Sequence, residues 1–382
     1  MRKKIAVITT TRADYGYLRS VMRAIRERED SELIPIAIGS HIFKDNATYE
    51  LVKEENPELE ECKVKEPNGT PLDNARFFAE MAKKSAPLLN RINPDFAVVL
   101  GDRIEMFGVA LSAVFQNIAI AHIHGGDRAG PAHDERIRNA LAKIVDVHFP
   151  ALPSSAERLI SMGEEPSRIH MVGSPTIDDL LSTKHLPIKD LLKKYNLKKD
   201  YVLVIQHPLT ATKRYSDGKR QIEETIEGVK LSGLDFLVVM PNQDIGSREI
   251  TKRLEEYYEN ERIKTIYGLN RDDYVGLLKF CKTLVGNSSS GIIEAASFKI
   301  PVVNIGPRQG QRDRSGNVID VPYERDRINN SIKYVCDNAD FKRKLSEVKN
   351  IYGDGQSGKR IAEILALLDN KNPNFLHKVN TY

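Results

Sequence analysis

Residues 283–298 read TLVGNSSSGIIEAASF and contain the successive parts of a parallel α/β repeat. Thr283–Val285 is a short apolar run of the kind that forms a buried strand, and Ile292–Phe298 has the composition of a helix. Between these segments, Gly286–Gly291 is a polar turn built from glycine, asparagine and serine. A buried strand that passes through a polar turn into a helix is half of a βαβ unit, so this stretch predicts a parallel sheet.

The same alternation of short apolar runs and longer amphipathic segments extends through the rest of the chain. In the first half we expect strands at Ile5–Thr10, Leu33–Gly39, Phe96–Gly101, Ile118–Ile123, Val147–Pro150 and Ile169–Gly173. In the second half we expect further strands at Tyr201–Gln206, Phe236–Met240, Thr265–Tyr267 and Val302–Ile305. Helices are expected at Tyr15–Arg28, Asn74–Ile92, Met106–Phe115, Glu135–Val145, Ala156–Met162, Arg220–Leu231, Arg248–Glu259, Asp272–Phe280 and Lys359–Leu368. Such a pattern predicts an α/β protein with two Rossmann-like, doubly wound domains.

The segment Leu181–Lys199 interrupts this alternation, because it is polar, rich in lysine and contains Pro187. We place the junction between the domains there. A chain of 382 residues is long enough for two hydrophobic cores of ordinary size. We therefore expect an N-terminal domain over residues 1–182, a C-terminal domain over residues 183–365 and a polar tail over residues 366–382.

The composition is that of an ordinary folded protein, with 29% charged residues, 41% hydrophobic residues and a formal net charge of +4. Basic residues are spread along the chain, so nothing points to a nucleic acid as a partner. No apolar run is long enough for a membrane span, and the N-terminal MRKKIAVI reads as a first strand rather than as a secretion signal. Cys62, Cys281 and Cys336 are far apart, which disfavours a disulfide framework or a metal site and suits a cytoplasmic protein.

Ligands of doubly wound sheets bind outside the carboxyl ends of the strands, and the turn Gly286–Gly291 lies at such an end. Consecutive small residues at a helix start expose backbone N–H groups, and the helix dipole favours an anion there. One serine would suffice for an ordinary N-cap, whereas Ser288, Ser289 and Ser290 exceed that need, so the turn favours a diphosphate site. Glu294, one turn later, is a candidate acceptor for ribose hydroxyls, with a solvated helix carboxylate as the alternative.

Two other loops carry candidate phosphate ligands. Arg308 and Arg312 flank a glycine turn, and their forked donors suit phosphate oxygens, although a solvated basic loop is the alternative. The stretch TTTRADYG, residues 9–16, follows the first strand in the position of a phosphate loop but lacks the glycine pattern of one. There, Arg12 is a candidate for diphosphate binding and Asp14 for a helix cap.

Acids and imidazoles gather at three neighbouring places in the first half. Asp102 and Arg103 follow one expected strand, the motif HIHGGD at residues 122–127 ends the next, and His133 and Asp134 begin the following helix. A cap or a core hydrogen bond is a sufficient explanation for any one of these residues. For the whole set, an active-site surface lined by general acid and base groups is the better explanation.

Two histidine positions leave alternatives open. His122 and His124 are two apart on a strand and face the same side, which also suggests a metal site, but no further ligand spacing supports a metal. In the second half, His207 ends the strand Tyr201–Gln206 within the motif QHP. Its imidazole is a candidate donor to a phosphate or leaving-group oxygen, and a capped strand end explains it as well.

Taken in order, the motifs TRADYG, GDR, HIHGGD, DERIR, QHP, GNSSSG and RQGQR resemble those of the hydrolysing UDP-N-acetylglucosamine 2-epimerase family of the sialic and legionaminic acid pathways. The resemblance extends from the first strand to YGDGQSGKRI at residues 352–361. It implies a GT-B-like fold in which two Rossmann-like domains enclose a central cleft. It also implies a homodimer or homotetramer that needs no cofactor.

The resemblance further implies roles for single residues. The UDP portion would be held by Arg12, His207, Ser288, Ser289, Ser290, Gly291, Glu294 and Arg312, and the backbone of Arg271–Tyr274, which includes Asp273, would meet the uracil. The sugar would be lined by Asp102, Arg103, His124 and Asp134, and the catalytic candidates are Asp102, His124, Asp134 and His207. Some members of the family have glutamate in place of His124, and many have histidine in place of Asn139. Both differences lie on the sugar side.

The implied reaction converts UDP-N-acetylglucosamine and water into N-acetylmannosamine and UDP, by elimination to a glycal and rehydration. A close alternative substrate is UDP-N,N′-diacetylbacillosamine of legionaminic acid synthesis. Two more distant alternatives share the nucleotide side, namely a GT-B glycosyltransferase and a UDP-sugar sensor without catalysis.

Overall fold

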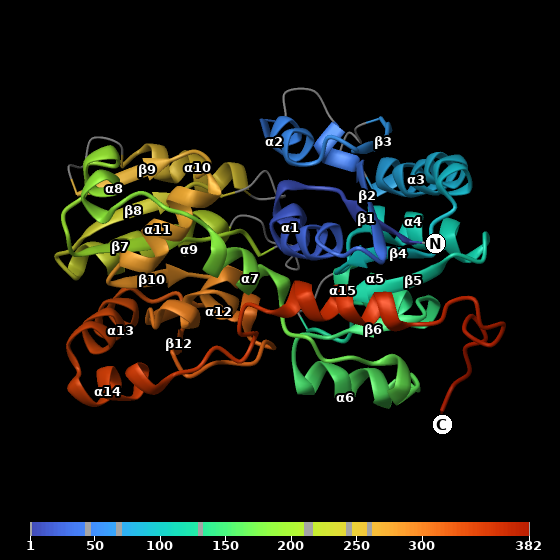
Figure 1. Ribbon diagram of the computed structural model, residues 1–382. Helices are drawn as coiled ribbons and strands as arrows, with labels where there is room; N and C mark the ends of the chain where they lie inside the picture. The colour runs from blue at the N-terminus through green and yellow to red at the C-terminus, as the bar shows by residue number, and fades with distance from the viewer. Residues whose placement is uncertain are drawn as a thin grey trace. The chain divides into compact units, whose positions relative to one another are not determined.

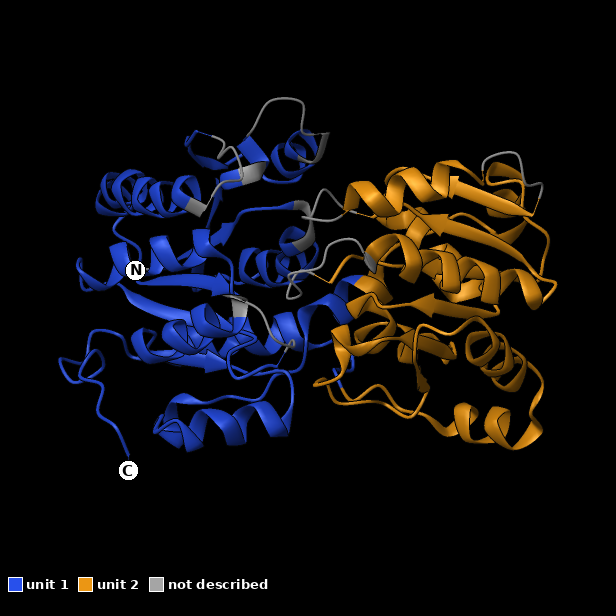
Figure 2. Cartoon of the chain, turned by 180° about the vertical axis from the view of Figure 1, so that it is seen from behind, with its two compact units in different colours: residues 1–128, 133–179, 352–382 blue, residues 129–132, 180–351 orange. Residues whose placement is uncertain are grey.

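The structure is a computed structural model that describes residues 2–42, 47–65, 71–128, 133–209, 217–241, 247–257 and 262–381. For residues 12, 13, 40, 47, 48, 71, 133, 134 and 217 it describes the backbone alone. The chain divides into two compact units, which Figure 2 colours separately. Unit 1 contains Met1–Arg128, His133–Asp179 and Tyr352–Tyr382, and unit 2 contains Leu180–Ile351. Within the described residues, no helix is long and apolar enough to cross a membrane.

Unit 1 is built on a six-stranded parallel sheet with the order β3-β2-β1-β4-β5-β6. Its strands are β1 (Lys3–Thr9), β2 (Ser31–Ile38), β3 (Glu60–Cys62), β4 (Phe96–Leu100), β5 (Ala119–Ile123) and β6 (Val147–Phe149). Every residue of β4 and β5 is buried, as expected for central strands that helices cover on both faces.

The helices of unit 1 are α1 (Arg12–Arg26), α2 (Ala47–Glu55), α3 (Pro71–Ile92), α4 (Ile104–Val114), α5 (His133–Ile144), α6 (Pro153–Ser161) and α15 (Ser357–Leu367). Short 3₁₀ turns form at Gly39–Ile42 and Pro166–Arg168. The chain leaves unit 1 within α7 (Pro175–Ser182) and returns to it at Tyr352.

Unit 2 has a second six-stranded parallel sheet, with the order β12-β11-β10-β7-β8-β9. Its strands are β7 (Tyr201–Ile205), β8 (Asp235–Val239), β9 (Ile263–Ile266), β10 (Thr283–Gly286), β11 (Val302–Ile305) and β12 (Val318–Val321). Its helices are α8 (Ile188–Lys194), α9 (Asp217–Leu231), α10 (Ser247–Glu255), α11 (Arg271–Phe280), α12 (Ser289–Ile293), α13 (Arg325–Asp337) and α14 (Ala339–Glu347), with 3₁₀ turns at Ala295–Phe298 and Pro307–Gln309. Val202 and Val204 of β7 pack in the core formed with α9 and α13, whereas the Tyr201 hydroxyl donates to the Leu277 carbonyl of α11 at 2.7 Å.

The two sheets have the same topology. Reading unit 2 from β9 to β12 gives the third, second, first, fourth, fifth and sixth strand of that unit, which is also the order in unit 1. This is the classic strand order of a dinucleotide-binding fold, so the expected pair of doubly wound, Rossmann-like domains is confirmed. In such a sheet the direction of winding reverses between the first and fourth strands, and ligands bind at the carboxyl ends there. The places to inspect are therefore the ends of β1 and β4 in unit 1, and of β7 and β10 in unit 2 (Figure 1).

The strand expected at Ile169–Gly173 does not form, and this prediction was wrong. Only Ile169 bridges to His148 of β6, and the backbone N–H groups of Val172 and Ser174 donate to Pro150 and Tyr352 instead. Conversely, the short edge strands β3 and β12 were not expected from the sequence. Their sequences, EEC and VIDV, contain acidic residues and therefore lack the usual apolar run.

The position of α15 also differs from the expected division of the chain, which assigned residues 183–365 to the second domain. In the structure α15 packs on α1 of unit 1, as Figure 1 shows, and a side chain at Gly358 would lie 2.8 Å from the Ser20 backbone. The Asp178 carboxylate caps α15 by accepting from the N–H groups of Ser357 at 3.0 Å and Gly358 at 2.6 Å. These contacts, together with the tail that follows, place Tyr352–Tyr382 in unit 1.

Candidate active site

The loop from β1 into α1 is organised by one buried carboxylate. Asp14 accepts hydrogen bonds from the hydroxyl of Thr9 at 2.7 Å and the backbone N–H of Thr11 at 2.9 Å, and it forms a capping box with Thr11. Burial raises the pKa of Asp14, but its hydrogen bonds, above all with His41, outweigh this effect and the net pKa is lowered. Asp14 therefore caps the helix, as one reading of the sequence had it, and fixes the backbone next to Arg12, whose side chain lies outside the described part of the chain.

At the end of β4, Asp102 forms an ion pair with Arg138 of α5. Arg138 is almost fully buried, with 4% of its side chain exposed, whereas 22% of the Asp102 side chain is exposed. The second guanidinium nitrogen of Arg138 donates to the backbone carbonyl of Asp127 at 2.9 Å. Arg138 therefore joins the end of β4 to the loop that follows β5.

Arg103, the next residue of the same loop, is the N-cap of α4 and donates to Glu105 at 2.9 Å. Glu105 is buried, with 4% of its side chain exposed. The guanidinium of Arg103 is held by this contact at the carboxyl end of the sheet, close to the position that the sequence predicted for it.

The loop after β5 brings together Asp127, His124 and Ser174. The Nδ1 atom of His124 lies 2.7 Å from an Asp127 oxygen, and its Nε2 atom lies 2.9 Å from the Ser174 hydroxyl. His124 adopts a left-handed backbone with φ of 65°, which is uncommon for a residue other than glycine and clusters at functional sites. Asp102 and His124 are thus connected through Arg138 and Asp127, while the side chain of Asp134 lies outside the described residues.

His122 has a different environment from His124. Its Nε2 atom lies 2.7 Å from the Gly101 carbonyl, and the side chain is completely buried. Burial lowers the pKa of His122 to about 3, so the imidazole is uncharged at neutral pH. The two histidines do not share a ligand position, and among the described residues no cluster of three metal-ligating side chains occurs.

In unit 2, Asn287 joins the ends of β7 and β10. Its side-chain oxygen accepts from the His207 N–H at 2.7 Å, and its amide nitrogen donates to the His207 carbonyl at 2.9 Å. Gly286 makes this approach possible, because its φ is 136° and a side chain there would lie 2.0 Å from the Ile205 carbonyl. The glycine and asparagine of the turn therefore have a structural reason, and they place His207 beside the serines.

The serine turn continues directly into a helix that is shorter than expected. Ser288 is the N-cap and lies 2.9 Å from the Ser290 hydroxyl, and α12 ends at Ile293 before a 3₁₀ turn. A helix of this length has little macrodipole, so what the turn offers to an anion is its local N–H and hydroxyl groups rather than a dipole. Ser289 and Ser290 are half-buried, and Gly291 is buried against Val302 of β11.

Glu294 and Asp273 are both engaged by other side chains. Glu294 is buried and forms an ion pair with Arg271 at 2.8 Å and a hydrogen bond with the Tyr274 hydroxyl at 3.0 Å. The Asp273 carboxylate accepts from Lys194 and Tyr195, each at 2.5 Å, and ties α11 to α8. The side chain of Asp273 thus has a structural role, and its contact with a ligand stays a prediction.

The loop after β11 folds back onto the same turn. The side chains of Arg308 and Gln309 donate to the Asn287 carbonyl at 3.1 and 3.2 Å. Arg312 follows after Gly310 and is half-buried. The sequence pointed to the arginines but not to Asn287, Arg138 or Ser174, whose partners lie far away along the chain.

Comparison with known proteins identifies the family. The family model described as UDP-N-acetylglucosamine 2-epimerase matches residues 23–366. A UDP-N,N′-diacetylbacillosamine 2-epimerase (hydrolyzing) from Legionella pneumophila is 32% identical over 100% of both chains. The polysialic acid biosynthesis protein P7 of Escherichia coli is 33% identical over 85% of this chain and 84% of that protein.

Among solved structures, a UDP-GlcNAc 2-epimerase from Neisseria meningitidis bound to UDP-GlcNAc aligns over 95% of this chain and 99% of that one, with a TM-score of 0.79 and 18% identity. This similarity extends through both units and confirms the expected GT-B-like fold. The motif set, the paired parallel sheets and the family match agree, and the chain belongs to the UDP-N-acetylglucosamine 2-epimerase family.

Proposed function

We propose that this protein is a hydrolysing 2-epimerase of UDP-linked 2-acetamido sugars. The observation that carries the proposal is the polar array of Asp102, Arg138, Asp127 and His124 at the winding reversal of unit 1. It occurs in a chain that is similar along its full length to a hydrolysing enzyme of this class. An array of this kind can exchange a proton with a bound sugar and can orient that sugar.

Unit 2 is proposed to bind the UDP portion. The serine turn at Ser288–Ser290 offers hydroxyls and backbone N–H groups, and the neighbouring Arg312 and His207 offer side-chain donors. These donors are the type that stabilises the negative charge of a departing diphosphate. Arg12 at the start of α1 is proposed as a further phosphate ligand from unit 1, and Glu294 as the ribose acceptor.

The reaction is an elimination followed by a hydration. The C1–O bond breaks first and UDP leaves, because the C2 proton becomes acidic enough only as positive charge builds at C1. A base then takes the C2 proton, and the electron pair of that C–H bond forms the C1–C2 double bond of a glycal. Water then delivers its hydroxyl to C1, and a proton arrives at C2 from the opposite face. The products are UDP and the free sugar with inverted C2, so that all atoms of sugar nucleotide and water are accounted for.

The carboxylates Asp102 and Asp134 are the proposed proton-transfer groups, and Arg103 is proposed to contact the sugar. Asp102 is suited to this role because Arg138 fixes its position and it is still partly exposed to a ligand. His207 is proposed to donate to the leaving-group oxygen, since the Asn287 pair fixes its backbone at the end of β7.

UDP-N-acetylglucosamine is the first proposed substrate, with N-acetylmannosamine as product for the synthesis of sialic-type acids. UDP-N,N′-diacetylbacillosamine is a second candidate, because the full-length Legionella relative is named for that sugar. The two sugars differ at C4 and C6 and share the reacting C1 and C2, so the same polar array serves both. We further propose that the protein is cytoplasmic and forms a homodimer or homotetramer. Light scattering of the purified protein tests the oligomeric state.

The deciding experiment incubates the protein with each sugar nucleotide in heavy water and follows the products by NMR. We expect UDP and a free 2-acetamido sugar with inverted C2 and deuterium at C2. Transfer to an added acceptor without deuterium at C2 would indicate a glycosyltransferase. UDP binding without release of any sugar would indicate a sensor, and either outcome overturns the proposal.

A further inference from the structure

Both ring nitrogens of His124 are engaged by buried partners of the protein. Asp127 lies 2.7 Å from Nδ1, and Ser174 lies 2.9 Å from Nε2. The side chains of His124 and Asp127 are 9% and 6% exposed, and Ser174 is completely buried. The ring of Tyr17 meets the imidazole edge-on with 5.4 Å between the centroids. The imidazole therefore lies in a closed environment rather than at the end of a mobile side chain.

The acceptors and donors around the ring define its tautomer. An ionised carboxylate only accepts hydrogen bonds, and the second Asp127 oxygen already accepts from the Ser155 hydroxyl at 2.8 Å. When the ring carries a single proton, that proton therefore lies on Nδ1, where it is donated to Asp127. The Nε2 lone pair then faces Ser174, whose hydroxyl donates to it.

Ser174 is itself fixed by the backbone at the place where the chain changes units. Its N–H donates to the Tyr352 carbonyl at 2.6 Å, and its carbonyl accepts from Ile177 in the first turn of α7. Gly173 before it has a φ of 88°, and a side chain there would lie 2.8 Å from the Ser357 hydroxyl. Tyr352 begins the returning segment of unit 1, so one serine connects His124 to both segments that cross between the units.

The backbone of His124 is fixed as well. Its N–H donates to the Phe149 carbonyl of β6 at 3.0 Å, and the left-handed φ of 65° persists because the surroundings determine it. Two residues later, a side chain at Gly126 would lie 2.2 Å from the Ser155 carbonyl, so the loop has little freedom to move.

We propose that Ser174 is a positioning residue for the proposed reaction. Ser174 holds His124 in one tautomer, and the imidazole in turn orients the sugar-side loop. The C2 proton is then taken by a carboxylate rather than by His124. The inference rests on the proposed function for its chemistry. It follows from the geometry because a ring with Nδ1 on Asp127 and Nε2 on Ser174 has no nitrogen left for the proton of a substrate.

The first test measures the tautomer and needs no turnover. The full chain is labelled with ¹⁵N-histidine, and the His124 ring is identified by its disappearance in His124→Gln. We expect the wild type to show a protonated Nδ1 and an unprotonated, hydrogen-bonded Nε2, and Ser174→Ala to move the Nε2 resonance. A proton on Nε2 in the wild type, or an Nε2 resonance that Ser174→Ala leaves in place, overturns the inference.

The second test separates positioning from proton transfer. We expect Ser174→Ala to lower kcat by about 10-fold to 100-fold, since a misplacement of about 1 Å can cost about 10²-fold. KM should change little. We expect Ser174→Thr, which retains the hydroxyl, to recover most of the loss. His124→Gln should still incorporate deuterium at C2, more slowly than the wild type. Complete loss of this exchange in His124→Gln, with UDP binding intact, would make His124 the base and contradict the inference.

A matched control is Ser112→Ala, because Ser112 is also a buried serine of unit 1 and donates to the Ala82 carbonyl at 2.7 Å where α4 packs on α3. Both alanine variants lose one buried hydroxyl, so equal losses of kcat in the two would assign the effect to stability and overturn a positioning role. If the wild type turns over neither sugar nucleotide, the proposed function fails, whereas the tautomer measurement still decides the contact between Ser174 and His124.

Discussion

The strand β4 has an aspartate beyond each of its ends, and the two half-buried residues have different partners. Asp95, before the strand, accepts from the Lys4 N–H at 2.8 Å and from Asn370 of the C-terminal tail at 3.3 Å. Asp102, after the strand, pairs with Arg138 and is 22% exposed. The same residue type thus serves to fasten the chain at the amino end of the sheet and to build a candidate active site at the carboxyl end.

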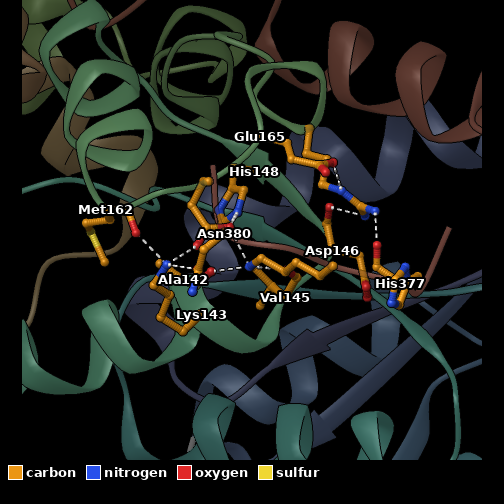
Figure 3. A network of polar contacts seen from close by, with 12 residues as sticks. Ala142, Lys143, Val145, Asp146, His148, Met162, Glu165, His377 and Asn380 are labelled. Carbon is orange, nitrogen blue, oxygen red and sulfur yellow. Dashed lines mark hydrogen bonds and ion pairs between the residues drawn. The ribbon is translucent and has the colours of Figure 1, made fainter. Parts of the chain in front are cut away.

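The amino end of β6 shows the fastening most clearly, as Figure 3 illustrates. Lys378 of the tail donates to the carbonyls of Ala142 at 2.7 Å and Val145 at 2.8 Å, and it forms an ion pair with Glu164. Glu164 also lies 2.9 Å from His148, and neither side chain is exposed. Burial raises the pKa of Glu164, but the hydrogen bonds with His148 and Lys378 prevail and bring the pKa to about 2.

The comparison teaches how to tell a structural charge from a functional one. At the amino end, the charged groups of this cluster contact groups from segments distant in sequence, and the carboxylate of Glu164 is fully buried while 15% of the Lys378 side chain is exposed. At the carboxyl end, the arginine is buried while its carboxylate partner keeps an exposed part. A ligand needs such an exposed part, so exposure next to a fixed partner is a better guide than charge alone.

The largest expected effect is a loss of kcat on substitution of the aspartate at the carboxyl end of β4, which the aspartate at the amino end should not share. We predict that Asp102→Asn lowers kcat by about 10³-fold, because the isosteric amide cannot accept the C2 proton, a contribution of about 10² to 10⁴. UDP affinity should stay within about twofold, since UDP is proposed to bind unit 2. Loss of a general acid or base raises the free energy of the transition state rather than weakening ground-state binding. Stopped assays of UDP release and calorimetry of UDP binding measure the two quantities.

The matched control for this prediction is Asp95→Asn at the other end of the same strand. It should reduce stability but retain turnover in the fraction that is folded. If Asp95→Asn and Asp102→Asn lose activity to the same degree, the functional distinction between the two ends is wrong.

The second prediction concerns the tail. Lys378→Met removes one of the two lysines that pair with the buried Glu164, while Lys143 stays at 3.0 Å, so the loss of this charged hydrogen bond should cost about 1.5 to 3 kcal/mol of unfolding free energy. Denaturant titration should show this loss, while the folded variant keeps its kcat. Lys371→Met is the control, because Lys371 is an exposed lysine of the same tail and its replacement should change stability little. A stable Lys378→Met protein would show that the tail does not fasten unit 1.

The third prediction uses pH and draws on His122 and His148, which are paired in register on the neighbouring strands β5 and β6. Burial lowers the pKa of His122 to about 3 and also lowers the pKa of His148. Below the unfolded pKa of about 6.5, the unfolded chain binds protons that the folded chain excludes, so stability falls as the pH decreases. From pH 7.5 to 5.5 the unfolding free energy should drop by about 1 to 1.5 kcal/mol through His122, and further through His148, measured by urea titration.

His148→Gln should remove part of this pH dependence, since one of the two titrating groups is lost. His377→Gln should remove none, because the side chain of His377 is exposed. An unchanged slope in His148→Gln would mean that this histidine is already protonated in the folded protein as an ion pair with Glu164.

Much of the fold was predictable because burial on both faces leaves a simple signal. Phe96–Leu100 and Tyr201–Ile205 are apolar throughout and form central strands of the two sheets as expected. The edge strands β3 and β12 carry acidic residues, and pairing with a single neighbour does not require an apolar run. The segment Ile169–Gly173 looks like a strand, but its N–H groups bond to irregular partners that the sequence does not reveal.

The candidate site was predictable in its location and less so in its contacts. The rule for parallel sheets places His207 and the serine turn at one reversal of winding, and Asp102 at the other. Arg138 and Ser174 escaped notice because their partners lie 36 and 50 residues away. Asp273 was expected at the ligand because its loop matched a family motif; its carboxylate accepts from Lys194 of α8, and its contact with a ligand stays a prediction.

The smallest expected effect is a small loss of stability in unit 2, and it extends the comparison of structural and functional carboxylates to Asp273. Its side chain is 3% exposed and accepts from Lys194, Tyr195 and Asn270, which is the pattern of the fastening end rather than of a ligand site. Asp273→Asn should therefore lower the unfolding free energy by about 1 kcal/mol, the usual value of one hydrogen bond. Lys194→Met, which removes the partner instead, should have a similar effect on stability. For Asp273→Asn, the Kd of UDP should change by less than about threefold, which corresponds to under about 0.7 kcal/mol. A tenfold weaker UDP complex with stability unchanged would place this carboxylate at the nucleotide after all, and full burial with several partners would then no longer distinguish a structural charge from a functional one.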